Sequence, residues 1–402
     1  MRIVRKILII ISKTVACALA VVVLVIAGTS FSPVYRFRAA EPFSGPDIFN
    51  PYKDLDTSIG WKRANFHTHT KVNGLMNECE YWPEEVDAKL RKLDYDIVTF
   101  SNHNELTPHP YDTAMQVNVY EHGYNLLKFH KLVFGSEEVM HYDHMLPIFA
   151  FQKQFQIEYL KKTSEIIQIN HPLRTPSLSE SQLEKLCGYR LIELDSGKST
   201  ENEYWDKALS AGRYSFGVAN DDLHYPDRSN RIGVRCNFLC CRSASWKDIK
   251  KCFDEGCFYS MRVPDYGNGD WSIKYEKNSH LPHVTGIGMK DNTIYIHLSC
   301  QADSIKVTGQ NHTTLMKVAD ACSLEYMMSS EDSYARMTAY FPEGEVIYSN
   351  PFARYDASSS ESPFNDEPLD YDLLLSILYN LAIVTICLVD IYVIYLILKR
   401  RK

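Results

Sequence analysis

The chain has 402 residues, which is enough for two domains of ordinary size together with attached segments. With 45% hydrophobic and 23% charged residues, its composition is that of a folded protein and excludes wholesale disorder and collagen-like repeats. The formal net charge is −7, and eight of the 43 basic residues lie in the first 13 and the last four positions. The part between these ends is therefore strongly acidic, which argues against nucleic-acid binding because a phosphate backbone would be repelled.

An apolar segment of membrane-spanning length lies at each end of the chain. Residues 7–28 carry one charge, Lys13, and residues 373–398 carry one charge, Asp390. About 20 apolar residues are enough to cross a bilayer. We therefore predict a transmembrane helix or signal anchor in residues 1–30 and a C-terminal transmembrane helix in residues 372–398. A cleaved signal peptide is the alternative for the first segment, since it has a basic start and small residues near its end.

The basic residues flank the two apolar segments on their outer sides. Because positively charged flanks stay in the cytoplasm, we expect residues 29–371 to lie outside the cytoplasm, whether or not the first segment is cleaved. A charge in the middle of a span is costly in lipid, so Asp390 predicts a helix partner. The cysteines between the spans lack the paired spacing of a zinc knuckle, and outside the cytoplasm one or two disulfides are open to them.

Between residues 61 and 262, short apolar runs alternate with helical stretches. Ile97–Phe100 and Ile166–Ile169 are examples of the runs, and Pro83–Leu93 and Trp246–Glu255 are examples of the helical stretches. Continuous apolar runs of this length suit strands of a parallel sheet that is covered on both faces. We expect an α/β domain in this region, built as a barrel or as a doubly wound sheet.

The pattern changes after Met261. Strand-like runs such as Trp271–Tyr275 and Thr293–Leu298 are separated by turn signals, which predicts a small all-β, sandwich-like domain over residues 263–355. Residues 356–371 are polar and contain Ser and Pro, and we expect them to form a linker to the second span.

The candidate metal ligands directly follow strand-like runs. In chain order they are His67, His69, His103, Glu137, His171, Asp222 and His224. Side chains at the carboxyl ends of barrel strands converge on one mouth. A single His-x-His pair is more often a surface or core feature, so the prediction depends on the joint pattern. This number of nitrogen and oxygen ligands suits two or three divalent transition ions, with a carboxylate such as Glu137 bridging a pair.

Five segments together resemble a known family. They are Phe66-His-Thr-His-Thr70, Thr99-Phe-Ser-Asn-His-Asn104, Gly135-Ser-Glu137, Asn170-His-Pro172 and Asn220-Asp-Asp-Leu-His224. In type and order they look like the PHP (polymerase and histidinol phosphatase) family, and the resemblance covers residues 61–262. It implies a distorted seven-stranded (β/α) barrel with a two- or three-metal centre at its mouth, where phosphate esters are hydrolysed.

The resemblance also implies a ligand set for Zn, Mn or Fe ions. His67, His69, Glu137 and Asp222 would hold the first ion. Glu137 would bridge to a second ion, held also by His171 and by a histidine before the next strand, for which we choose His144 over His141. His103 and His224 would serve a third ion. The neighbouring acids Glu138 and Asp221 rank behind Glu137 and Asp222.

The sequence departs from the family pattern at two positions. Asn73 and Asn102 stand where the family often has acids. A neutral amide is a poorer ligand for a dication than a carboxylate, which predicts a weak, transient or empty third site.

The implied chemistry uses a metal-activated water that attacks phosphorus. His171 or His224 would protonate the leaving group, and Arg174 and Arg228 would clamp phosphoryl oxygens, because guanidinium matches phosphate geometry. A solvent-facing ion pair is the alternative for each arginine. The residues that we expect in catalysis are Glu137, His171, Asp222, His224 and Arg174.

We therefore predict a membrane-anchored, metal-dependent phosphoesterase, a phosphatase or phosphodiesterase, that acts on a phosphorylated small molecule or lipid head group. The chain lacks a Gly-x-Ser-x-Gly elbow, a Walker loop and a dinucleotide fingerprint. Two alternatives stay open. One is a metal-dependent hydrolase of another bond, such as an amide. The other is a catalytically silent metal-binding ectodomain that acts as a sensor or as a partner of other membrane proteins.

Overall fold

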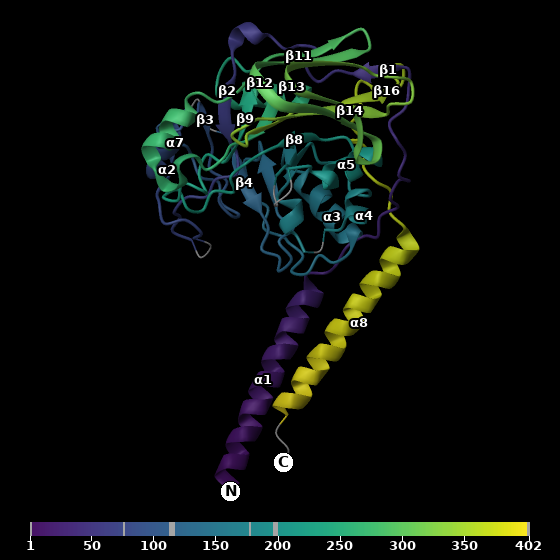
Figure 1. Cartoon of the computed structure of the whole chain (residues 1–402). Coiled ribbons are helices and arrows are strands. Elements are labelled where there is room, and N and C mark those ends of the chain that lie inside the picture. Colours follow the sequence, from purple (N-terminus) through teal and green to yellow (C-terminus); the bar gives the residue numbers. More distant parts are fainter. Residues whose placement is uncertain (1, 75–76, 112–116, 177, 196–199, 400–402) are drawn as a thin grey trace.

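Two long apolar helices, α1 (Arg2–Gly28) and α8 (Leu373–Leu398), project side by side from one end of the body (Figure 1). The structure is a computed structural model that describes residues 2–74, 77–111, 117–176, 178–195 and 200–399. Both helices are long and apolar enough to cross a membrane, as expected. Lys13 Nζ donates a hydrogen bond to the carbonyl oxygen of Ile397 (2.7 Å), so the two basic ends of the chain lie at the same end of the helix pair.

Among the described residues, α8 packs along α1 and contacts α3 through Tyr379. Asp390 Oδ2 is buried and has no hydrogen-bond partner within the described part of the chain. A helix partner for Asp390 outside this chain stays a prediction.

A five-stranded sheet lies at the centre of the body. Its strands, in spatial order, are β4 (Val119–His122), β5 (Lys131–Phe134), β6 (Ile166–Ile169), β7 (Leu191–Glu193) and β8 (Phe216–Val218). The last three strands are parallel, whereas β5 runs antiparallel to both of its neighbours. Every residue of these strands is buried, which agrees with the continuous apolar runs of the sequence.

A second, eleven-stranded sheet covers the upper part of the body in Figure 1. Its strands are β1 (Asp47–Phe49), β2 (Lys62–Asn65), β3 (Ile97–Val98), β9 (Arg235–Leu239), β10 (Phe258–Arg262), β11 (Val284–Lys290), β12 (Thr293–Gly309), β13 (Thr313–Met327), β14 (Tyr334–Tyr340), β15 (Val346–Tyr348) and β16 (Phe352–Tyr355). The order β1-β16-β14-β15-β10-β9-β2-β3 forms its main path, and β12 joins β11 and β13 to β14.

In the described part of the chain, six shorter helices surround the sheets. They are α2 (Pro83–Arg91), α3 (Ala150–Leu160), α4 (Glu180–Leu183), α5 (Glu203–Ser210), α6 (Trp246–Glu255) and α7 (Trp271–Asn278). Helix α6 has the predicted bounds because both ends carry local signals. The Ser245 hydroxyl accepts from the backbone N–H of Asp248, and Gly256 ends the helix with a φ of 89°.

A closed seven-stranded barrel is not present in the described part of the chain. The two sheets are joined by the isolated bridges Thr68–Leu223 and His103–Glu121 and do not close on each other. The gaps lie between β3 and β4 and between β8 and β2, where a single bridge takes the place of a continuous ladder, whereas β5 pairs fully with both of its neighbours. What the structure shows is a mixed α/β body with two open sheets.

The expected sandwich of residues 263–355 is also different in the structure. Strand β15 pairs with β10 at Ile347 and Met261, so the later strands extend the sheet that contains β2, β3 and β9. Trp271–Tyr275, expected as a strand, lies in helix α7, because the Asp270 side chain caps that helix by accepting from the N–H groups of its first turn. Met145–Phe151, another apolar run expected as a strand, forms a loop up to Phe149 and then the first two residues of α3.

Residues 356–371, expected as a linker, contact the body. The Phe364 ring lies edge-on to Tyr214, with ring centres 4.6 Å apart, and the guanidinium of Arg190 lies 3.7 Å from its centre. Tyr371 bridges to Tyr35, just beyond α1. The segment before α8 is therefore held against the body at its middle and against the segment after α1 at its end.

Candidate metal centre

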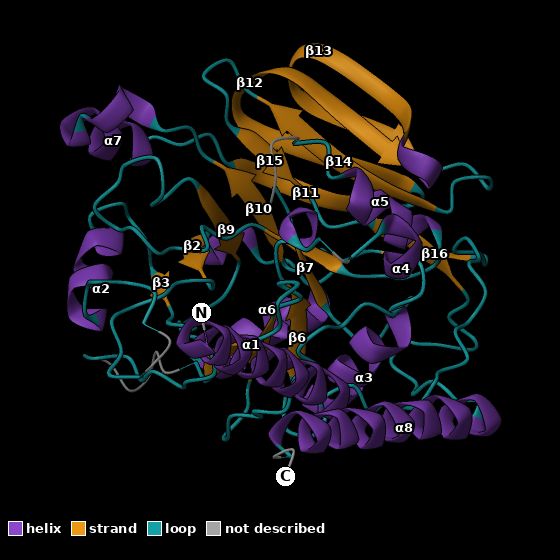
Figure 2. Cartoon of the chain, turned by 90° about the horizontal axis from the view of Figure 1, so that it is seen from below, coloured by secondary structure: helices purple, strands orange, loops and turns teal. Residues whose placement is uncertain are grey.

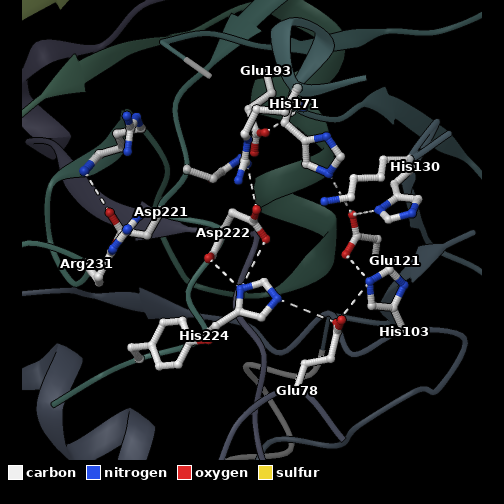
Figure 3. A pocket seen from close by; sticks show the side chains of 15 residues that line it. Glu78, His103, Glu121, His130, His171, Glu193, Asp221, Asp222, His224 and Arg231 are labelled. Carbon is white, nitrogen blue, oxygen red and sulfur yellow. Dashed lines mark hydrogen bonds and ion pairs between the residues drawn. The ribbon is translucent and has the colours of Figure 1, made fainter. Parts of the chain in front are cut away.

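Histidines and acids from almost every strand of the inner body meet in one cluster (Figure 3). Each follows, precedes or belongs to a short buried strand, so the backbone fixes its position. They are His67 and His69 after β2, His103 after β3, Glu121 in β4, His130 before β5, His171 after β6, Glu193 in β7, and Asp222 and His224 after β8.

Glu121 occupies the centre of this cluster and is only 1% exposed. Its Oε2 atom lies 3.1 Å from His67 Nε2, 3.2 Å from His69 Nε2 and 3.1 Å from His103 Nε2. Its Oε1 atom lies 3.2 Å from His130 Nδ1 and 3.3 Å from His171 Nε2. One carboxylate is thus placed between two sets of imidazoles, which is the arrangement of a bridging ligand.

Asp222 is a second carboxylate beside His67 and His69. Its Oδ1 atom lies 3.1 Å from His67 Nε2 and 3.4 Å from His69 Nε2. Both nitrogens are buried and lack a hydrogen-bond partner among the described residues, although each faces two carboxylate oxygens. Nitrogen and oxygen atoms that converge in this way fit a divalent transition-metal ion.

Glu193 holds His67 and His171 in position. Its Oε1 atom lies 2.9 Å from His67 Nδ1, and its Oε2 atom accepts a hydrogen bond from the backbone N–H of His171 (2.7 Å). A carboxylate on the second nitrogen of a ligating histidine fixes the tautomer and the orientation of the ring. Glu193 was not predicted as a site residue, because it lies inside a short and otherwise apolar run, Leu191–Leu194.

Glu78 brings a carboxylate to the outer side of the cluster. Its Oε2 atom lies 3.0 Å from His103 Nε2 and 3.6 Å from His224 Nε2. Asn73, where the family pattern suggested a missing acid, is exposed. Asn102 is buried, and its Oδ1 atom accepts from the backbone N–H of Thr70. Glu78 thus brings a carboxylate to His103 and His224, the two histidines that we expected at a third ion, and whether that ion is bound stays a prediction.

Among the residues that the structure describes, three groups of donors satisfy the distance requirement for a shared ion, with all donor atoms of a group within 4.8 Å of one another. They are His67, His69, Glu121 and Asp222; His69, Glu78 and His103; and His103, Glu121 and His130.

The charges of the cluster shift the pKa values of Glu121 and His67 toward the charged forms, whereas burial outweighs Glu121 at His130 and lowers the pKa of that imidazole. Burial raises the pKa of the Glu121 carboxyl, but His103, His67 and His130 outweigh burial and hold that pKa well below its ordinary value. Burial lowers the pKa of His67, but Glu121 and Asp222 outweigh burial and raise that pKa well above its ordinary value. Protons and divalent cations therefore compete for the same nitrogens, and binding a cation would release protons.

A cavity of about 700 Å³ opens in front of the cluster. Four basic residues help to line it, namely Lys128, Arg174, Arg231 and Arg235. Arg174 NH2 lies 2.6 Å from Asp222 Oδ2, yet the arginine side chain is still 48% exposed. Arg228, the second expected clamp, is exposed and stacks on Tyr225, 4.3 Å from the ring centre. Three of these basic residues, Lys128, Arg174 and Arg231, are exposed, and we call this side of the cavity the basic entrance. Exposed basic side chains favour an anionic ligand.

Two of the expected ligands lie outside the cluster. Glu137 is exposed and lines a different cavity, beside Leu106 and Val117. The reason is the direction of β5. Because β5 runs antiparallel to β6, its carboxyl end lies at the opposite end of the sheet from His171, and the neighbouring Glu138 is exposed there as well.

His144 is the second correction. It is buried between the rings of Tyr142 and Phe155, at 5.5 and 5.4 Å between ring centres, and burial lowers its pKa to about 4. Since no strand follows it, nothing directs it toward the site, and the fallback His141 is exposed. His130, immediately before β5, lies in the cluster instead.

The remaining expected residues come together as the strand-end argument required. His67, His69, His103, His171, Asp222 and His224 all lie in the cluster. Asp221, the competitor of Asp222, accepts hydrogen bonds from the backbone N–H groups of Gly233, Val234 and Arg235, so it holds a loop in place.

No protein-family model matches the chain, and no curated protein matches its sequence. Among solved structures, the chain is similar to a two-domain protein from Bacteroides vulgatus ATCC 8482 that contains a predicted PHP-like metal-dependent phosphoesterase. The sequence identity is 14%, the match covers 79% of this chain and 99% of that chain, and the TM-score is 0.35.

Proposed function

We propose that the protein is a metal-dependent hydrolase of phosphate esters. The observation that carries this proposal is the position of Glu121, a buried carboxylate between five imidazoles at the floor of a cavity whose entrance is basic. Metal ions at such a site activate water and neutralise the charge of the phosphoryl group. The basic entrance favours phosphate esters over uncharged amides as substrates.

In this proposal Glu121 takes the bridging role between two ions. His67, His69 and Asp222 would hold the first ion, and His103 and His130 would hold the second, with His171 beside them. The donor types suit Zn, Mn or Fe. Because His69 and His103 also belong to the group of Glu78, a third ion would compete for their nitrogens, and Glu78 decides how tightly it is held.

Residues of the chain itself would bind the substrate and move the proton. Arg174 and Lys128 lie at the cavity and would bind the non-bridging phosphoryl oxygens. His224 is the most exposed imidazole among the members of the cluster given above, and its pKa is raised because Glu78 and Asp222 outweigh its burial. A protonated imidazole at this position would donate its proton to the leaving oxygen.

The experiment that tests this function is a hydrolysis assay on the purified full chain in detergent. We expect Mn²⁺ or Zn²⁺ to support hydrolysis of p-nitrophenyl phosphate or of bis-p-nitrophenyl phosphate, and a chelator to remove the activity. Bound metal without hydrolysis of either ester would contradict the proposal and favour a silent metal-binding domain. Cleavage of a p-nitroanilide, with both esters untouched, would favour amide chemistry.

Replacing Glu78 with Gln is expected to weaken the binding of one ion by about 10- to 100-fold, since the change removes the charge of a carboxylate that faces His103 and His224. Metal titration of the purified chain measures this affinity. Glu80→Gln is the matched control, because Glu80 is exposed in the same loop. Equal effects of the two changes would show that Glu78 does not contact an ion.

We also propose that residues 29–371 lie outside the cytoplasm. The support is that the basic ends of α1 and α8 lie together at the far end of the helix pair, away from the body (Figure 1). With both basic ends in the cytoplasm, the body and its cavity would face the other side of the membrane.

A further inference from the structure

Four exposed apolar side chains lie near the end of the body from which α1 and α8 project. They are Leu126, Ile148, Phe149 and Leu173, between 48% and 62% exposed, and we call them the apolar rim. Single exposed apolar residues are ordinary on protein surfaces. These four differ because hydrogen bonds connect their segments to the end of α1 on one side and to the candidate metal centre on the other.

The segment around Ile148 is fixed to the membrane helices. The Tyr142 hydroxyl donates to the carbonyl oxygen of Thr29 (3.0 Å), one residue beyond α1, and the N–H of Met145 donates to the Thr29 hydroxyl (3.2 Å). The Phe149 ring stacks on Phe151 at 5.2 Å between ring centres. The Phe151 ring in turn lies 4.9 Å from that of Tyr379, which belongs to α8.

Helix α3 and strand β6 connect the membrane helices with the metal centre. Helix α3 begins beside Tyr379, where Gln152 Nε2 donates to the tyrosine hydroxyl (3.1 Å). The helix is followed by β6, and His171 lies two residues beyond the end of that strand. Seen from below, α3 appears between α1 and α8, and β6 appears next to α1 (Figure 2).

Short contacts connect the cavity to the apolar rim. Lys128 lines the cavity, and its carbonyl oxygen accepts a hydrogen bond from the Thr175 hydroxyl (2.9 Å). Two residues earlier, the N–H of Leu126 donates to the carbonyl oxygen of Met145 (3.0 Å). Leu173 lies between His171 and Arg174 in one 3₁₀ turn. The apolar rim therefore borders the entrance on the side of the membrane.

We propose that the apolar rim inserts into the lipid interface and that the substrate is a membrane lipid with a phosphate ester in its head group. This inference rests on the proposed function and names its substrate class. Water would supply the oxygen that bonds to phosphorus, the bond from phosphorus to the leaving alcohol oxygen would break, and that oxygen would take up a proton.

The chemistry of the entrance agrees with a lipid substrate. Aromatic side chains such as Phe149 and Tyr379 are typical of the membrane–water interface. Lys128 and Arg174 lie between the apolar rim and the cluster, where basic side chains attract anionic head groups. A soluble phosphate ester would need the basic residues alone and would give no role to the apolar rim.

The first experiment compares lipid and soluble substrates of the full chain in nanodiscs. The nanodiscs contain dioleoylphosphatidylcholine with dioleoylphosphatidate, which present a phosphodiester and a phosphomonoester, and released phosphate, choline and phosphocholine are measured. The double change Leu126→Ser with Phe149→Ser is expected to lower kcat/KM for the bilayer lipid about tenfold or more. The activity on dihexanoyl analogues below their micelle concentration should stay unchanged. Met327→Ser is the matched control, because Met327 is 72% exposed on β13, far from the membrane helices (Figure 1).

The second experiment measures insertion without any activity. Tryptophan at position 149, from Phe149→Trp, should be quenched by lipids that are brominated in their acyl chains, whereas tryptophan from Met327→Trp should not be. Hydrolysis of p-nitrophenyl phosphate with no cleavage of either bilayer lipid would overturn this inference and leave the proposed function standing. Absence of quenching at position 149 would also overturn it. Failure to hydrolyse any ester would overturn the proposed function and this inference with it.

Discussion

The change Glu121→Gln is expected to reduce hydrolysis by roughly 10²- to 10⁴-fold, because metal ions at such a site stabilise the transition state by several kcal/mol. The same change should lower the metal content of the purified chain. The physical reason is that Glu121 belongs to two donor groups, so that removing its charge weakens both. Element analysis and the esterase assay on the full chain measure the two effects.

Glu137→Gln is the control for this prediction. Glu137 is exposed beside Leu106, away from the cluster, and its replacement should leave metal content and activity unchanged. Loss of metal from the Glu137 variant, with the Glu121 variant intact, would restore the assignment that the sequence alone suggested and would contradict the site described above.

The second large effect concerns folding. Asp206 in α5 and Arg336 in β14 are both 1% exposed, and Arg336 NH2 lies 2.5 Å from Asp206 Oδ2. The Tyr334 hydroxyl also donates to Asp206 (2.9 Å). Removing one partner of a buried ion pair typically costs about 3–5 kcal/mol, because the remaining charge stays buried. Asp206→Asn should therefore lower the unfolding midpoint of the full chain in detergent by roughly 5–15 °C, as measured by tryptophan fluorescence.

The stabilisation by Asp206 is also expected to depend on pH. Burial raises the pKa of Asp206, but Arg336 outweighs burial and holds the pKa below its ordinary value. The pair therefore contributes stability above the ordinary pKa of about 4 and loses it as the pH falls through the lowered pKa. The difference between the wild type and Asp206→Asn should shrink in acid. Lys277→Ala, at the exposed pair with Glu343, should leave the unfolding midpoint nearly unchanged and serves as the control. If Asp206→Asn unfolds at the same temperature as the wild type, the ion pair between α5 and β14 does not stabilise the fold.

Signals that act over a few residues predicted local structure well. Ile166–Ile169 forms β6 with the expected bounds, and Ser245 and Gly256 mark the two ends of α6. The same kind of signal, Asp270 as an N-cap, identifies α7, but the aromatic run after it was interpreted as a strand. The periodicity of a short aromatic segment does not decide between helix and strand.

Strand direction explains most of what the sequence did not predict about the site. Residues that follow the parallel strands, such as His171 and Asp222, lie in the cluster as expected. An apolar run looks the same in a parallel and in an antiparallel strand, so the reversal of β5 was not visible. That reversal moves Glu137 to the far end of the sheet and brings His130 into the site instead. Glu121 lies within β4, and the segment Val119–His122 shows no alternation that would mark it as a strand.

The metal content of the full chain, purified without chelators and analysed by element, decides whether the cluster around Glu121 is a metal centre. We predict about two ions per chain of Zn, Mn or Fe, and a content that falls when Glu121 is replaced by Gln but not when Glu137 is. A chain that binds no divalent transition metal, even after incubation with Zn²⁺ and Mn²⁺, would contradict the assignment of the cluster around Glu121 as a metal centre.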